Sequence, residues 1–240
     1  MTNSLSSPSE ATVSRVLLTG VEPFGRNHLN SAWEACRLLA KSPPQEIELE
    51  VVLLPCAFGD SIAELRKQML RLEPDLVIST GQGGSRPDIT IERVAINLND
   101  AEGADNNGNQ PIDEPIVADG PAAYFSSIPV KACTESLLKA GIPASVSHTA
   151  GTFLCNHIAF GLAHLIATEF PHVQGGFVHI PFTPAQAADR QRRPSMASTT
   201  AADALRIVIS TALRTSSEHS ASSRSTRSGT ARWFPRRSRK

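Results

Sequence analysis

The sequence has few aromatic residues, few cysteines and no long hydrophobic run. Aromatic residues make up 5% of its 240 residues. No apolar run approaches the roughly 20 residues that cross a bilayer, and residues 1–14 are polar, without the basic and apolar segments of a secretory signal. The four cysteines form no CxxC pair and no dense disulfide framework, which favours a reducing compartment. We therefore expect a cytoplasmic protein without a membrane partner.

The chain also has no net charge, but its charges are unevenly distributed. Seven basic residues and no acidic residue lie between Arg224 and Lys240, so the rest of the chain is mildly acidic. Serine and arginine dominate from Thr215 onward. This composition predicts that residues 215–240, like residues 1–14, form disordered tails. The basic tail could contact nucleic acid, but we favour a solvated extension and expect no nucleic-acid partner.

Short apolar runs alternate with helical patterns between residues 15 and 214, where we expect a single α/β domain. The alternation predicts a three-layer α/β/α sandwich with a mostly parallel twisted sheet. Asn30 or Ser31 is expected to cap the first helix and Asp60 the second, and residues 98–129 are expected to be mostly loop. The predicted strands are Arg15–Thr19, Glu48–Leu54, Leu76–Thr80, Asp88–Asn97, Ala144–Ser147 and Gly176–Ile180, and the predicted helices are Ser31–Lys41, Ser61–Leu72, Val130–Ala140, Asn156–Glu169 and Ser198–Leu213.

Ligands of such sheets bind beyond the carboxyl ends of the strands. Chemistry is therefore expected after Thr19, Thr80 and Ser147, and at the end of the 176–180 strand. Cys155 lies in this region, where a loop meets the start of a predicted helix. Unpaired N–H groups and the helix dipole at that point favour the nucleophilic thiolate. The alternative is that Cys155 is a small buried hydrophobic residue.

A cysteine nucleophile needs a base and a group that orients the base. Among the seven histidines, His179 stands out because it lies near the end of an apolar strand, although a strand histidine can also be a core residue. Glu92 places a carboxylate in another apolar strand. It could orient the histidine, or it could pair with a neighbouring arginine at the surface.

Two other kinds of site were considered. The glycine-rich segment Gly81–Arg86 could cradle phosphate, as in a nucleoside phosphorylase, but it lacks the Walker lysine and leads into a strand. Cys155 and His157 could ligate zinc, but no second Cys/His pair accompanies them. We therefore expect neither a metal nor a cofactor.

Three long motifs occur in order along the chain, at Gly81–Asn97, Ala150–His157 and Gly176–Pro181, and the stretches Leu18–Gly25 and Asn30–Ala35 add to them. Together they resemble the pyroglutamyl peptidase I family of cysteine peptidases, also called pyrrolidone-carboxylate peptidases. The similarity runs from about Arg15 to Leu213.

The resemblance implies a catalytic triad of Cys155, His179 and Glu92 that removes an N-terminal pyroglutamyl residue from peptides through a thioester. It implies a homo-dimer or homo-tetramer. It also implies a pocket for the flat lactam ring, with Phe24 and Phe153 as walls and Gln82 and Asn30 near the lactam group. The full set of implied substrate-binding residues is Phe24, Asn30, Gln82, Phe153, Leu154 and Gly103.

One departure from the family pattern lies in this pocket. The family commonly carries arginine, an apolar residue and proline where this chain has Glu102, Gly103 and Ala104. A glutamate near a developing oxyanion repels it, whereas an arginine stabilises it. We therefore expect weaker turnover or altered preference, and the alternative function is a catalytically weak relative that binds pyroglutamyl or similar lactam ligands.

Overall fold

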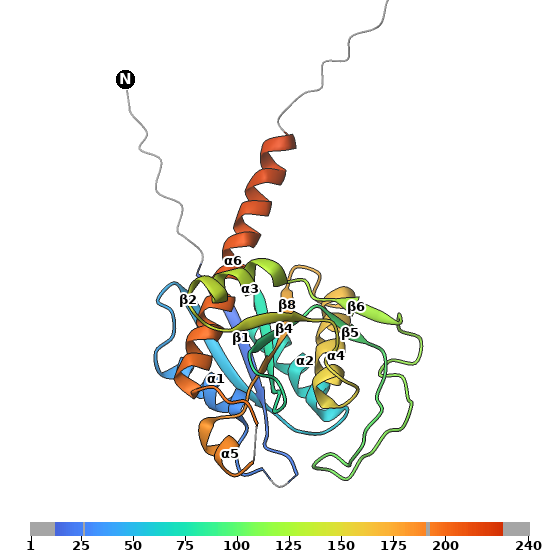
Figure 1. Ribbon diagram of the computed structural model, residues 1–240. Helices are drawn as coiled ribbons and strands as arrows, with labels where there is room; N and C mark the ends of the chain where they lie inside the picture. The colour runs from blue at the N-terminus through green and yellow to red at the C-terminus, as the bar shows by residue number, and fades with distance from the viewer. Residues whose placement is uncertain (1–12, 26, 191–192, 228–240) are drawn as a thin grey trace, which may run out of the picture.

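A six-stranded sheet forms the centre of the computed structural model, which describes residues 13–25, 27–190 and 193–227 (Figure 1). The sheet strands are β1 (Ser14–Val21), β2 (Ile47–Leu54), β3 (Leu76–Gln82), β4 (Ile89–Glu92), β7 (Ala144–Ser147) and β8 (Gln174–Ile180), in the order β2-β1-β3-β8-β4-β7. All neighbouring strands pair in parallel except β4 and β8, which are antiparallel. A second sheet contains β5 (Val94–Ile96) and β6 (Ala123–Phe125).

Helices cover both faces of the large sheet, as Figure 1 shows. Apolar side chains of α1 (Ser31–Lys41), α3 (Val130–Lys139) and α6 (Ser198–Arg227) pack on one face. Those of α2 (Asp60–Leu72) and α4 (Leu154–Thr168) pack on the other. A short helix, α5 (Pro184–Ala188), follows β8. The predicted α/β/α sandwich with a mostly parallel sheet is thus confirmed.

The side chains of β8 show how the sheet divides the core. Val178 and Ile180 belong to the cluster under α1, α3 and α6, whereas Phe177 belongs to the cluster under α2 and α4. Because side chains alternate along a strand, His179 faces the same side as Phe177. This places His179 on the α4 side of the sheet, near the carboxyl end of β8.

The structure differs from the sequence prediction in one divided strand, one helix start and two short additional elements. The single strand expected over Asp88–Asn97 is divided into β4 and β5, because the Arg93 N–H donates to Ser147 O in the large sheet while Arg93 O accepts from Ser126 N beside β6. Helix α2 is preceded by Gly59 at a φ of 76°, so Asp60 is its first residue rather than its cap. The short elements β6 and α5 were not predicted.

The predicted tails lie largely outside the described residues, which exclude 1–12 and 228–240. Helix α6 continues to Arg227, fourteen residues beyond the predicted end at Leu213, and so enters the stretch for which a disordered tail is predicted. Neither proline nor glycine interrupts this stretch, and both are the residues that most disfavour a helix.

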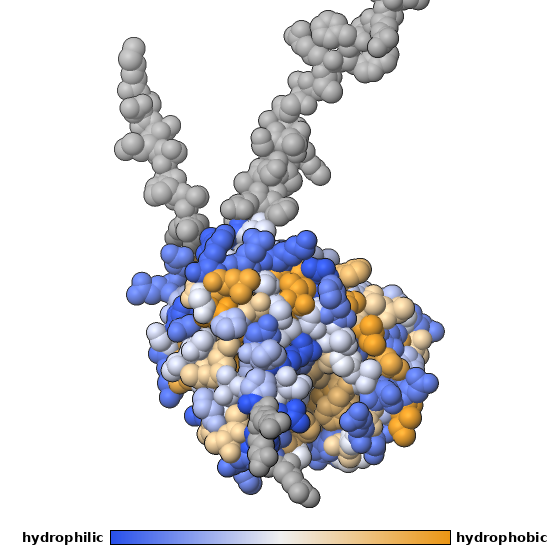
Figure 2. All heavy atoms as spheres, in the orientation of Figure 1, coloured by the Kyte–Doolittle hydropathy of each residue, from blue (hydrophilic) through white to orange (hydrophobic). Residues whose placement is uncertain are grey.

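The surface seen in Figure 2 is mostly hydrophilic, with apolar side chains in several small patches. Phe125 and Ile112 are the most exposed large apolar side chains among the described residues, at 76% and 68%. No helix in the described ranges has both the length and the apolarity needed to cross a bilayer.

Candidate active site

A cavity of about 600 Å³ opens beyond the ends of β3 and β8. Its walls come from segments far apart in sequence: the loop after β1, the turn after β3, the loop after β5 and the loop that leads into α4. Six of the residues singled out from the sequence line it, namely Phe24, Gln82, Gly103, Phe153, Cys155 and His179.

Glu92 and His179 lie on neighbouring strands and face the same side of the sheet. In the β4–β8 pair Glu92 is opposite Phe177, so His179 is its diagonal neighbour, two residues further along β8. His179 Nδ1 lies 2.8 Å from Glu92 Oε1, and the two side chains are 5% and 2% exposed. An ionised carboxylate only accepts hydrogen bonds, so Nδ1 carries the hydrogen and Nε2 is the basic nitrogen.

Cys155 is the second residue of α4, and its thiol lies against the backbone of Gly81. A Cβ at Gly81 would stand 2.7 Å from Cys155 Sγ and 2.8 Å from Phe177 Cζ, so the close approach of the thiol requires glycine there. Gly81 is also the residue opposite His179 in the β3–β8 register. The thiol therefore lies over the strand position that is directly opposite His179.

Burial disfavours the charged forms of both the thiol and the imidazole. Burial raises the pKa of Cys155 to about 12, helped by the neighbouring Cys56 and Glu92 and opposed by Arg86. Burial also lowers the pKa of His179, although the hydrogen bond to Glu92 opposes this. Desolvation thus opposes the thiolate that the helix terminus favours.

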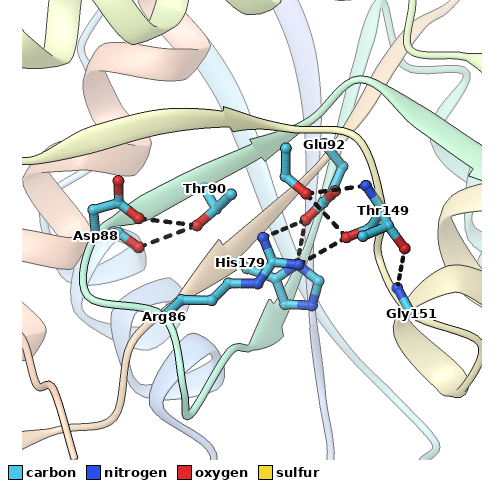
Figure 3. Close-up of polar contacts among 8 residues, drawn as sticks. Arg86, Asp88, Thr90, Glu92, Thr149, Gly151 and His179 are labelled. Atoms are coloured by element: carbon cyan, nitrogen blue, oxygen red, sulfur yellow. Dashed lines mark hydrogen bonds and ion pairs between the residues drawn. The ribbon is translucent and has the colours of Figure 1, made fainter.

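Arg86 contacts both Glu92 and the loop before α4 (Figure 3). Its Nη1 lies 2.9 Å from Glu92 Oε1 and its Nη2 donates to the carbonyl oxygen of Thr149 at 2.8 Å. Glu92 thus pairs with an arginine and with the histidine at once, which joins the two alternatives that the sequence left open. The partner was not predicted because Arg86 was interpreted only as part of an anion-binding loop.

Aromatic rings form one wall of the cavity. The ring centroids of Phe24 and Phe153 are 5.6 Å apart, and Phe58 packs edge-on against Phe153 at 5.4 Å. Gln82 contributes a fixed polar group, since its Oε1 accepts from Ser31 N at 3.0 Å and from Gln186 Nε2 at 2.7 Å. These two bonds orient the carboxamide and leave Nε2 as its donor.

Two residues implied as substrate-binding do not line the cavity. Asn30 caps α1, where its Oδ1 accepts from Ala32 N at 3.0 Å and from Trp33 N at 3.5 Å. Leu154 is 2% exposed and packs in the core between the sheet and α4. Their role as ligand contacts stays a prediction. The exposed rim carries two acids, Asp100 and Glu102, which line the cavity beside Gly103.

His157, one turn into α4, joins that helix to two loops. Its Nε2 accepts from Gly59 N at 3.0 Å, and its Nδ1 pairs with Asn99 Oδ1 at 3.0 Å. Since an amide oxygen can only accept, Nδ1 carries the hydrogen and the ring is neutral. Burial lowers the pKa of His157 to about 4. The ring is therefore a structural connector rather than a zinc ligand.

The geometry also weakens the two other kinds of site. In the turn after β3, Gly83 N donates to Ile180 O at 2.8 Å and Arg86 N donates to Gly83 O at 2.9 Å, so these amides are committed within the fold and do not cradle phosphate. In the described part of the chain, no three His, Cys, Asp or Glu side chains come together as metal ligands.

Comparisons with known proteins identify the family of the chain. The family model for pyroglutamyl peptidase matches residues 14–215. The pyrrolidone-carboxylate peptidase of Streptomyces coelicolor is 52% identical over 206 residues, covering 86% of this chain and 95% of the relative. Pyrrolidone-carboxylate peptidase 2 of Photorhabdus laumondii is 50% identical over 207 residues, covering 86% and 95%.

Solved structures of similar proteins share the fold. The crystal structure of pyroglutamyl peptidase I from Bacillus amyloliquefaciens superposes with a TM-score of 0.80 at 45% identity, covering 83% of this chain and 96% of that one. The pyrrolidone carboxyl peptidase of Thermococcus litoralis gives 0.83 at 33% identity, covering 86% and 96%.

An α/β sandwich with a cysteine, a histidine and a glutamate gathered at one end of its sheet defines the class as a cysteine peptidase. Within that class, the chain belongs to the pyroglutamyl peptidase family.

Proposed function

We propose that this protein hydrolyses the N-terminal pyroglutamyl residue of peptides, with Cys155 as nucleophile, His179 as general base and then acid, and Glu92 as the group that orients the imidazole. The observation that carries the proposal is the 2.8 Å contact between His179 and Glu92 beneath a cavity that also exposes Cys155. Family membership supports the same activity.

The protonation states give the order of the steps. Because burial favours the neutral thiol and the neutral imidazole, His179 Nε2 takes the Cys155 proton as the sulfur attacks the pyroglutamyl carbonyl. Glu92 stabilises the imidazolium that forms. The backbone N–H groups at the start of α4 lack intrahelical partners, so they can bind the oxyanion of the tetrahedral intermediate.

Collapse of the intermediate breaks the C–N bond and leaves a thioester. The departing amine takes its proton from His179, which returns to the neutral form. His179 then accepts a proton from water as the water attacks the thioester. Pyroglutamate leaves, and Cys155 regains its proton.

The cavity suits a flat, uncharged lactam. The rings of Phe24 and Phe153 provide an apolar wall, and Gln82 Nε2 can donate to the lactam carbonyl. Gly103 lines the same cavity, whereas Asn30 and Leu154 are buried outside its lining. Ligand contacts by these three residues stay part of the proposal. The cytoplasmic location and the dimeric or tetrameric assembly remain part of the proposal.

The proposal is tested with a fluorogenic pyroglutamyl amide. We expect turnover by the wild type and a loss of about 10⁴-fold or more in Cys155→Ser. Cys133→Ser is the matched control, since Cys133 is buried in the core on the other face of the sheet. Turnover that persists in Cys155→Ser would contradict the mechanism.

The same assay separates the alternative of a lactam-binding relative. If neither the wild type nor Cys155→Ser turns over the amide, while pyroglutamate still raises the melting temperature of both, the protein binds the ligand without efficient catalysis. The Asp100 and Glu102 rim is the observation that favours this alternative.

A further inference from the structure

We propose that Arg86 is a positioning residue of this site, which ties the carboxylate that holds His179 to the loop that delivers Cys155. The inference deepens the proposed function and rests on it for the roles of the three residues that Arg86 connects. Figure 3 shows the guanidinium between Glu92 and Thr149, beside the His179 ring.

The first arm of Arg86 neutralises a buried charge. Arg86 Nη1 and His179 Nδ1 both contact the same oxygen, Glu92 Oε1, at 2.9 Å and 2.8 Å. A buried carboxylate needs an opposite charge, and the neutral imidazole does not supply one. Arginine remains charged at every physiological pH, so Arg86 is the counter-ion that lets Glu92 hold an uncharged base.

The second arm reaches the nucleophile loop. Arg86 Nη2 donates to Thr149 O at 2.8 Å, and Ser147 Oγ donates to the same carbonyl at 2.9 Å. Thr149 belongs to the segment that links β7 to Cys155 at the start of α4. The planar guanidinium can serve two acceptors at fixed angles, which a single ammonium on a flexible stem cannot reproduce.

The stem of Arg86 is itself fixed by the turn after β3. Arg86 N donates to Gly83 O at 2.9 Å. A Cβ on Gly83 would stand 2.7 Å from Arg86 Cδ and 3.2 Å from His179 Cβ, so the arginine stem and the histidine pack against the same glycine. The Arg86 side chain is 23% exposed and lines the cavity.

The charge of Arg86 acts on both reacting groups. Arg86 and Glu92 are the charged groups that face His179, while Cys155 is faced by Cys56, Glu92 and Arg86. Arg86 lowers the pKa of His179 and that of Cys155. Removing its charge should therefore raise both pKa values, an effect that loss of packing alone would not produce.

The test measures alkylation of Cys155 by iodoacetamide as a function of pH, followed by mass spectrometry of the peptide that contains it. No substrate is needed, so the result does not depend on the proposed function. We expect the rate–pH profile of Arg86→Gln to move to higher pH, and that of Arg86→Lys to keep the wild-type midpoint. Arg66→Gln is the control. Arg66, on α2, also holds a carboxylate, that of Glu169, which follows the end of α4 far from Cys155.

Turnover of a pyroglutamyl amide gives the second measurement. We expect kcat to fall by about tenfold or more in both Arg86 variants while KM changes little, and the acidic limb of kcat/KM to move to higher pH only in Arg86→Gln. If Arg86→Gln does not fold, as judged by circular dichroism, Arg86→Lys alone decides: the proposal requires a lower kcat with an unmoved profile.

The proposal is overturned if Arg86→Gln folds but leaves the alkylation midpoint in place, or if both variants keep kcat within about twofold of the wild type. If Arg86→Gln shifts the alkylation profile but the wild type itself does not turn over the amide, the proposed function is refuted and the role of Arg86 stands.

Discussion

The floor of the cavity is made by strands of the central sheet, whereas its rim is an exposed loop. We call the residues beneath the cavity its floor: Gly81, Glu92 and His179 on three adjacent strands, with Cys155 on α4 packed against Gly81. Of these, His179 and Cys155 line the cavity itself. The rim loop consists of residues 100–104, and its acids Asp100 and Glu102 are solvent-exposed. The floor leaves no room for a single additional carbon, while the rim has open space around Gly103.

This difference separates what the site does from what it selects. A reaction that depends on the relative positions of sulfur, imidazole and carboxylate needs the rigidity of paired strands. Recognition of the rest of the substrate can be left to a loop, where substitutions cost the fold little. The departure that the family resemblance implies at Glu102, Gly103 and Ala104 lies on this rim loop.

Gly81→Ala is the most severe test of the cavity floor. Its Cβ would stand 2.7 Å from Cys155 Sγ, so the thiol or the helix carrying it must move. Because a displacement of about 1 Å costs on the order of 100-fold in rate, we expect a loss of that size in kcat with a folded protein. Steady-state kinetics and circular dichroism measure the two effects.

Gly161→Ala is the matched control for crowding. A Cβ there would clash with Ile62 Cδ1, where α4 packs on α2 and away from the thiol. It should lower the melting temperature and spare kcat. If the two variants lose activity equally, the cavity floor is not specifically rigid and the comparison fails.

His157 connects α4 to two loops and gives a prediction for pH dependence. Its pKa is about 4 in the folded protein, below the usual 6.5, so the unfolded chain binds the proton more readily. Stability is complete above pH 6.5 and falls as the pH drops toward 4. The difference corresponds to about 3 kcal/mol for this buried ring, and urea unfolding at several pH values measures it.

A variant with no titrating group at this position isolates the contribution. His157→Gln should be less stable than the wild type at pH 7, yet its stability should decline less between pH 6.5 and 4. His172→Gln, at an exposed histidine, should decline as the wild type does. Parallel curves for the wild type and His157→Gln would show that the ring does not remain neutral in the fold.

The sequence predicts the features that local patterns determine, and it misses those that depend on distant segments meeting in space. The sheet and its helices follow from apolar periodicity, and the positions of Cys155 at a helix start and His179 near a strand end follow from the α/β pattern. The pairing of Arg86 with Glu92 and Thr149 could not be predicted, because it depends on three segments meeting in space. The alternating residues from Ile89 to Ile96 also gave no sign that Arg93 passes the chain from one sheet to the other.

The charge state of the thiol depends on packing that the sequence does not show. A helix start can be located from the sequence, and its dipole favours a thiolate. The desolvation that raises the pKa of Cys155 comes from the tight packing around Gly81 and Phe177, which only the assembled sheet creates. Local signals thus identified the residues of the site, whereas the charge on each depends on tertiary packing.

Glu102→Arg should have the smallest effect, because it changes the exposed rim loop alone. Replacing a negative by a positive charge beside the developing oxyanion should raise kcat/KM by a few-fold, and added salt should reduce the gain because exposed charges are screened. The matched control is Asp119→Arg, the same charge change at an exposed residue outside the cavity. Kinetics with a pyroglutamyl amide at low and high ionic strength would distinguish the two variants.

An equal gain in both would mean that net charge, rather than the position of Glu102, is responsible. No gain in Glu102→Arg would mean that the rim loop does not influence the reaction, and the departure at Glu102 would then be neutral for catalysis.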